Sequence, residues 1–209
     1  RPLPVQLASL RLYDLRHDCP THAGVLLLSE RPTHWLAGAY VQFVRFGGTE
    51  STSPVVDEKR VEGDLATLLQ RLDMLLDVTL RQRPILVTNL REEMRVDYPK
   101  PAVRELVLNA IMHRDYQSAA PTRFFWFDDR IEIHSPGGLY GAVSAENFPH
   151  QTDYRNPLVA EVMRTLGYAN RFGVGVQRAQ EAMRLNGNPP VEFAFDPHGV
   201  RVILRAVTS

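Results

Sequence analysis

The spacing of apolar and polar residues predicts a mixture of helices and strands. Leucines repeat at three- and four-residue steps from residue 64 to 81, which is the period of one helix face, and Asp64 is a residue type that favours a helix start. Residues 101–115 show a second helical period. Two runs rich in aromatic and β-branched residues, 122–127 and 130–134, are typical of a β-hairpin.

Weaker patterns precede and separate these elements. Apolar residues within 6–16 indicate a short helix. The continuous apolar run Val25–Leu28 is typical of a buried strand, and we expect it to pair with a second strand at 39–46. Residues 85–87 suggest a further strand, after which 91–97 is a charged connecting segment.

The C-terminal region also alternates between predicted helices, strands and loops. Residues 139–155 are polar, aromatic and rich in turn formers, which is the composition of a long loop or lid. A helix is expected from Asn156-Pro157 to Gly167, with Leu158, Val162, Met163 and Leu166 on its inward face. Another helix follows residue 175, and the chain ends with strands at 191–195 and 200–206.

This order predicts an α/β (α+β) fold, in which helices cover one face of a largely antiparallel sheet as a two-layer sandwich. We place a domain boundary near residue 95. Residues 1–95 would form a smaller N-terminal α/β lobe with the leucine-rich helix, and residues 96–209 a second domain.

Composition limits the classes of function. The 209 residues carry 24 basic and 24 acidic side chains, so no overall positive field attracts nucleic acid. The single cysteine, Cys19, excludes an internal disulfide and is compatible with the cytoplasm, where we expect the protein. No apolar run approaches the roughly 20 residues of a membrane span, so no membrane partner is expected.

The chain starts at Arg1 without a methionine, which suggests that an N-terminal domain is missing.

The candidate chemistry begins on the helix at 101–115. Glu105, Asn109 and His113 recur at four-residue steps, so they share one face, opposite an apolar face. Carboxylate and amide oxygens suit Mg²⁺, and a carboxylate can also polarise a water molecule. Such a spacing alone is common on solvated helices, so it needs further support.

Two glycine turns supply that support. Gly137 and Gly138 follow Ser135-Pro136 at the end of a predicted strand, where a ligand could approach the backbone closely. Gly173 and Gly175 precede a predicted helix, whose free amides favour a phosphate. Each turn alone is weak evidence, but their order after the polar helix indicates an ATP site.

The end of the polar helix carries His113-Arg114-Asp115, which could form a proton-transfer pair or a metal site. No second histidine or cysteine stands at ligand spacing, so we expect these residues to close the helix and support the edge of the site. No G-x-x-x-x-G-K-[ST] motif occurs, which excludes a P-loop motor at the level of motifs.

Several segments together resemble a bacterial and archaeal family of transcriptional regulators and RecG-related helicase-like proteins. Its members pair a Schlafen/AlbA-type DNA-binding domain with a C-terminal ATPase-like domain of the GHKL (HATPase, Bergerat-fold) type. The similar segments are residues 99–116, 128–139, 155–158 and 171–175, with weaker similarity at 23–28 and 42–49.

The resemblance implies roles for the candidate residues. Glu105 would be the general base and Asn109 a ligand of Mg²⁺, whereas Gly137 and Gly138 would lie beside the adenine of ATP and Gly173 and Gly175 beside its phosphates. Ser135 departs from the family pattern, in which an aspartate accepts a hydrogen bond from the adenine amino group. A neutral hydroxyl accepts that bond more weakly than a carboxylate does.

We therefore expect an ATP-binding regulatory domain of a DNA-associated protein, with Mg²⁺ as cofactor and slow hydrolysis left open. Partners would be an adenine nucleotide, a second copy in a homodimer, and DNA bound through the upstream domain. The alternative is a degenerate GHKL fold that serves as a dimerisation module without nucleotide. A third hypothesis, direct DNA binding through arginines of this chain, ranks last because the net charge is zero.

Overall fold

The computed structural model describes residues 1–80, 82–88, 90–169 and 173–207. Its centre is a six-stranded sheet with the order β4-β3-β7-β8-β10-β9. The strands are β3 (Val41–Phe46), β4 (Val55–Val61), β7 (Thr122–Trp126), β8 (Arg130–Pro136), β9 (Glu192–Asp196) and β10 (Gly199–Arg205). Neighbouring strands are antiparallel except β3 and β7, which run parallel.

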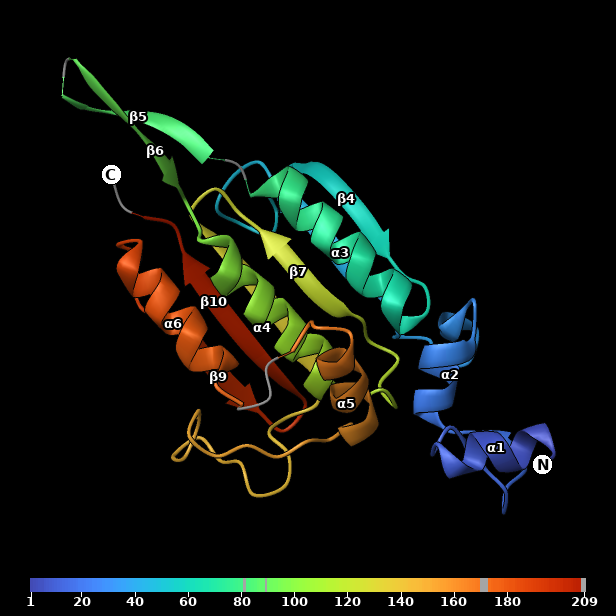
Figure 1. Cartoon of the computed structure of the whole chain (residues 1–209). Coiled ribbons are helices and arrows are strands. Elements are labelled where there is room, and N and C mark those ends of the chain that lie inside the picture. Colours follow the sequence, from blue (N-terminus) through green and yellow to red (C-terminus); the bar gives the residue numbers. More distant parts are fainter. Residues whose placement is uncertain (81, 89, 170–172, 208–209) are drawn as a thin grey trace.

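The main helices cover one face of this sheet (Figure 1). They are α3 (Leu65–Thr79), α4 (Lys100–His113) and α6 (Gly175–Leu185), while α5 (Pro157–Thr165) packs against the end of α4. The core lies between the two layers, where sheet residues such as Phe43, Phe124 and Ile133 meet buried residues of the helices. The predicted fold class is therefore confirmed, and one side of the sheet is left without helices.

The leucine-rich helix forms as its period predicts. The six leucines of α3 at positions 65, 68, 69, 72, 75 and 76 are all buried in the core. Asp64 caps the helix, because its side chain accepts a hydrogen bond from the Thr67 amide at 3.0 Å. The stripe packs in the core between the sheet and α4. Burial of each leucine stabilises the fold by roughly 2 kcal/mol.

The N-terminal segment differs from its prediction. The first helix, α1, spans Leu3–Ser9 and stops well before residue 16, because the chain turns at Arg11, whose φ is +61°. The predicted strand at Val25–Leu28 is wrong, since these residues belong to helix α2 (His22–Leu28). Thr21 caps α2 by accepting a hydrogen bond from the Gly24 amide, and periodicity alone cannot separate a short buried strand from a buried helix.

The predicted pairing of 25–28 with 39–46 is consequently also wrong. Strand β3 pairs instead with β7 and with β4, a strand that the hydrophobic pattern did not reveal. β4 is an edge strand with a charged centre from Asp57 to Arg60, so it lacks the apolar alternation of a half-buried strand. Two short strands, β1 (Tyr13–Asp14) and β2 (Cys19–Pro20), and the 3₁₀ turn η1 (Pro32–His34) complete this region.

Between α3 and α4, the chain forms a separate antiparallel hairpin of β5 (Gln82–Thr88) and β6 (Arg91–Val96). Figure 1 shows this hairpin projecting from the body of the molecule. It contains the predicted strand at 85–87, and the segment expected to connect at 91–97 is its second strand. The domain boundary near residue 95 stays a prediction, although the central sheet joins strands from both sides of it.

The C-terminal elements follow the sequence closely, apart from the rotation of α5. Its buried residues are Val159, Ala160 and Met163, whereas Leu166, predicted to face inward, is 47% exposed. Gly167 ends this helix with a φ of +79°, as predicted. None of the helices in the described part of the chain has the length and apolar character needed to cross a membrane.

Candidate functional site

The polar stripe of α4 faces a cavity of about 150 Å³. Glu105, Asn109 and His113 all line it, while the opposite side of α4 is buried in the core through Val103, Val107 and its neighbours. The shared face predicted from the four-residue spacing is thus present. An apolar cavity of comparable size admits a benzene ring, so a planar heterocycle is within its capacity.

The walls of the cavity come from six parts of the fold. They are α4, β8 with the glycine turn after it, the segment 139–155, Tyr168 and Ala169 after α5, the start of α6 with Gly173 before it, and the inward faces of β9 and β10. Ser135, Gly137, Gly138, Gly173 and Gly175, the remaining residues predicted for the nucleotide, all line it too. Arg171 and Phe172 of the similar segment lie outside the described residues.

Gly175 lies against the two polar residues of α4. A Cβ atom on it would lie 2.6 Å from Glu105 Oε2 and 3.5 Å from Asn109 Nδ2. Glu105 and Asn109 therefore point into one small space that only a glycine at 175 leaves open. Carboxylate and amide oxygens, such as those of Glu105 and Asn109, are the ligand types that Mg²⁺ prefers.

The other glycines bring the backbone close to the cavity. Gly137 has a φ of +92°, and a Cβ on it would lie 2.8 Å from the Asp115 Cβ. Gly173 has a φ of +64°, which also disfavours any other residue. A Cβ on Gly138 would lie 2.6 Å from the carbonyl oxygen of Asp196. These contacts explain why glycine is required at both turns.

Ser135 is buried at the floor of the site, between β8 and α4. Its hydroxyl donates a hydrogen bond to the Ala110 carbonyl at 2.9 Å. Because this bond fixes the proton, the lone pairs of the Ser135 oxygen are left to accept a hydrogen bond. Ser135 can therefore act as an acceptor, which is the role of the aspartate that it replaces in the family pattern.

His113 lies at the edge of the cavity and stacks on Tyr154, with ring centroids 5.4 Å apart. Burial, and then the positive charge of Arg155, lower the pKa of His113 below its usual value. The imidazole is therefore neutral at pH 7. Among the described residues, no group of three or more histidine, cysteine or acidic side chains could hold a metal ion.

Arg114 and Asp115 lie beside the site and do not line the cavity. Arg114 is 2% exposed and donates hydrogen bonds to the carbonyls of Gly38, Ser118 and Ala120, so it ties the loop before β3 to the loop before β7. Burial lowers the pKa of Arg114; the carbonyls accept from its two Nη atoms, while its buried Nε has no hydrogen-bond partner among the described residues. The Asp115 amide donates to the Pro136 carbonyl at 2.7 Å and so fixes the approach to Gly137.

Asn156, in the segment 155–158, binds the end of α4 next to the cavity. The Asn156 side chain donates to the carbonyls of Met112 and Arg114, at 3.0 and 2.8 Å. These carbonyls belong to the last turn of α4, which has no further helical partners for them. Asn156 thus joins the start of α5 to the end of α4, next to His113.

An aromatic wall of the cavity was not predicted from the sequence. Phe148, from segment 139–155, packs on Phe193 and Phe195 of β9, with ring centroids 4.9 and 5.0 Å apart. Gln177 of α6 donates to the Pro149 carbonyl at 3.1 Å and holds the same segment. Phe193 and Phe195 share one face of β9 because alternate residues of a strand do, and only the fold brings Phe148 to that face.

The charges around the cavity are mainly acidic. Among the described lining residues, Glu105 and Asp153 are the only carboxylates, and no lysine or arginine lines the cavity. Arg104 is adjacent, with its Nη1 atom 3.4 Å from Glu105 Oε1, and also bonds to the carbonyls of Gly167 and Tyr168. A phosphate group would therefore need a cation beside Glu105.

Comparison with known proteins bears on part of this site. A family of HATPase type, described as "Putative ATP-dependent DNA helicase recG C-terminal", has a sequence profile that covers residues 120–204. This part of the chain matches that family. It runs from β7 to β10 and includes the two glycine turns, and the match indicates an ATP-binding type of domain. The helix with Glu105 and Asn109 lies outside the matched residues.

A solved structure resembles the whole chain. It is the crystal structure of the DIP2311 protein from Corynebacterium diphtheriae, with a TM-score of 0.75 and 26% sequence identity over 98% of this chain. The match covers 41% of that protein, so this chain spans about two fifths of its length. No curated protein matches this chain.

Proposed function

We propose that this chain binds ATP together with Mg²⁺ in the cavity beside α4. The observation that carries this proposal is the convergence of seven residues on one cavity: Glu105, Asn109, Ser135, Gly137, Gly138, Gly173 and Gly175. They come from three separate stretches of sequence, which the fold brings together. The match of residues 120–204 to an HATPase family supports the same ligand.

Each residue has a role that its surroundings allow. The Ser135 oxygen accepts a hydrogen bond from the adenine amino group, because its own proton is held by Ala110. The free amides at the start of α6 and at Gly173 receive the phosphates. Asn109 holds Mg²⁺ through its side-chain oxygen, with phosphate oxygens and waters as the other ligands, an arrangement that Mg²⁺ favours.

Glu105 would act as the general base. Its side chain is 12% exposed and lies beside the space that Gly175 leaves open, where an attacking water would stand. When bound, Mg²⁺ supplies charge neutralisation for the phosphates near this carboxylate. We propose slow hydrolysis, since a regulatory domain needs long-lived bound and free states.

Nucleotide binding would act on the segment 139–155. This segment lines the cavity. Its Phe148 packs on β9, and its Pro149 carbonyl accepts a hydrogen bond from Gln177 of α6. A bound nucleotide would reposition it and so bias dimerisation or the posture of an upstream DNA-binding domain. The longer chain of the C. diphtheriae protein leaves room for such a domain in a relative.

The alternative function is a protein-interaction module without nucleotide. The acidic lining of the cavity favours it, because no described lining residue offers a positive charge to a phosphate. Titration calorimetry of ATP into the 209-residue chain, with and without Mg²⁺, separates the two functions. Magnesium-dependent binding supports the ATP site, whereas the absence of heat at millimolar nucleotide supports the interaction module.

Variants then test the individual roles. Glu105→Gln should retain ATP binding and lose hydrolysis, while Asn109→Ala should lose the dependence of binding on Mg²⁺. Glu181→Gln is the matched control, because Glu181 lies on the surface of α6 and pairs only with Arg184 among the described residues. A Glu105→Gln protein that hydrolyses ATP at the original rate would exclude Glu105 as the base.

A further inference from the structure

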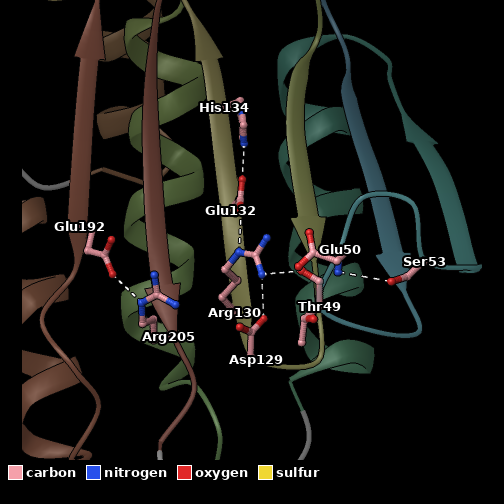
Figure 2. A network of polar contacts seen from close by, with 9 residues as sticks. All are labelled: Thr49, Glu50, Ser53, Asp129, Arg130, Glu132, His134, Glu192 and Arg205. Carbon is pink, nitrogen blue, oxygen red and sulfur yellow. Dashed lines mark hydrogen bonds and ion pairs between the residues drawn. The ribbon is translucent and has the colours of Figure 1, made fainter.

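The face of the central sheet opposite the helices carries a row of basic side chains. In Figure 2 this face is toward the viewer, with the strands in front of the helices. On β8, Arg130, Glu132 and His134 point out from it, because alternate residues of a strand share a face. At one end the loop 47–54 folds against the sheet, where Arg130 donates to the Thr49 carbonyl at 2.8 Å.

The basic row lies at the opposite end of this face, next to His134. The strand register places Arg201 of β10 directly opposite His134, and Arg123 of β7 opposite it on the other side. The row continues through Gln42 of β3 to Arg60 of β4. With about 4.8 Å between strands, it spans roughly 19 Å from Arg201 to Arg60.

The two arginines beside His134 have no acidic partner. Arg123 and Arg201 are exposed, and neither side chain makes an ion pair or hydrogen bond with any other described residue. Arg123 and Arg201 lie on either side of β8, so their backbones are about 10 Å apart. A ligand with several negative charges could contact both.

The acidic groups on this face are already engaged. Glu132 accepts hydrogen bonds from Arg130 at 2.6 Å and from His134 at 2.8 Å. Further out, Glu192 pairs with Arg205 at 2.6 Å. Toward β4, Glu58 accepts a hydrogen bond from Gln42, and Arg60 pairs with Glu62 at 2.8 Å. Glu58 and Asp196 accept hydrogen bonds only from neutral groups, so they keep their negative charge toward the two edges of this face, and Arg123 and Arg201 between them are the arginines without an acidic partner among the described residues.

An aromatic surface borders the same row. Phe125 lies two residues beyond Arg123 on the same face of β7, and its ring centroid is 5.6 Å from that of His134. Ile203 of β10 lies on the same face and continues this apolar strip, whereas Val44 of β3 is buried. Guanidinium groups for phosphates next to rings for bases are the combination by which flat sheets bind single-stranded nucleic acid.

We propose that the open face of the sheet binds single-stranded nucleic acid across β10, β8 and β7, through Arg201, His134 and Arg123. The phosphates contact the two arginines, and bases lie against His134 and Phe125. This surface is on the other side of the sheet from the ATP cavity, so it requires neither nucleotide nor a further domain.

The test is the anisotropy of a fluorescent 20-nucleotide single strand titrated with the 209-residue chain between 0.05 and 0.2 M salt. Each phosphate contact contributes about 0.7 to the slope of log affinity against log salt, which is about fivefold in affinity between 1 and 0.1 M. The variant with Arg123→Gln and Arg201→Gln should therefore bind about 25-fold more weakly at 0.1 M salt, with a slope smaller by about 1.4.

Arg178→Gln is the matched control, because Arg178 is an exposed arginine on α6, away from this face. It should bind as the original chain does. All variants should keep the same melting temperature, since the substituted side chains are exposed.

Three results would overturn the proposal. The original chain could fail to bind the oligonucleotide at 0.05 M salt, or the double variant could bind as tightly as the original. An acidic peptide or a duplex that competes at equal or lower concentration than the single strand would assign the face to a different partner.

Discussion

The replacement of Gly175 by alanine tests how the site is built. The added Cβ would lie 2.6 Å from Glu105 Oε2, about 0.8 Å short of the 3.4 Å at which ordinary contacts begin, so the carboxylate must move by about that amount. A misplacement of about 1 Å in a catalytic site can cost about 100-fold in rate. We therefore expect ATP hydrolysis to fall by roughly 10- to 100-fold.

Stability should change in the opposite direction. Gly175 is the first residue of α6 and does not have a positive φ, so alanine fits its backbone. Such a Gly→Ala change stabilises a protein by about 0.4–1 kcal/mol, because it lowers the conformational entropy of the unfolded chain. The assays are phosphate release at saturating ATP, calorimetry with Mg²⁺, and urea unfolding.

Gly187→Ala provides the contrasting control. A Cβ there would have no atom within 4 Å, but its φ is +81°, which strains any other residue. This variant should lose about 1 kcal/mol of stability and keep its ATP affinity. If Gly175→Ala binds and hydrolyses ATP as the original chain does, then Glu105 and Asn109 do not share a ligand at this point.

Three further predictions concern the stability of the fold. Asp64→Ala should cost about 1 kcal/mol in urea unfolding, because α3 loses its cap on Thr67; an unchanged midpoint would show that the cap is dispensable. Arg114→Met should cost more than about 3 kcal/mol, since three buried carbonyls lose their donors, and a melting temperature within a degree of the original would contradict this. The lowered pKa of His113 means that the unfolded chain binds a proton more readily, so its contribution to stability is full above about pH 6.5 and is lost as the pH falls toward the folded-state pKa. His113→Gln should therefore flatten the unfolding free energy between about pH 6.5 and 5, and an equal slope in both proteins would exclude this role.

The sequence by itself determined the elements with a long and regular period. The leucine stripe of α3, the shared face of Glu105, Asn109 and His113, and the hairpin of β7 and β8 follow from spacing alone. The reason is local, since helical and strand periods decide which residues share a face. The glycine turns could also be located, because few other residues tolerate the backbone found at Gly137 and Gly173.

The tertiary structure decided everything that depends on distant pairing. Val25–Leu28 became a helix although its apolar run suits a strand, because a short buried segment takes whichever form its neighbours complete. β4 was hidden by its charged residues, and its place is fixed only by the edge of β3. Likewise, the space at Gly175, the approach of Phe148 to β9 and the row from Arg201 to Arg60 arise only when separate segments pack together. No local pattern encodes such contacts, because the two segments that meet in each of them lie far apart in the sequence.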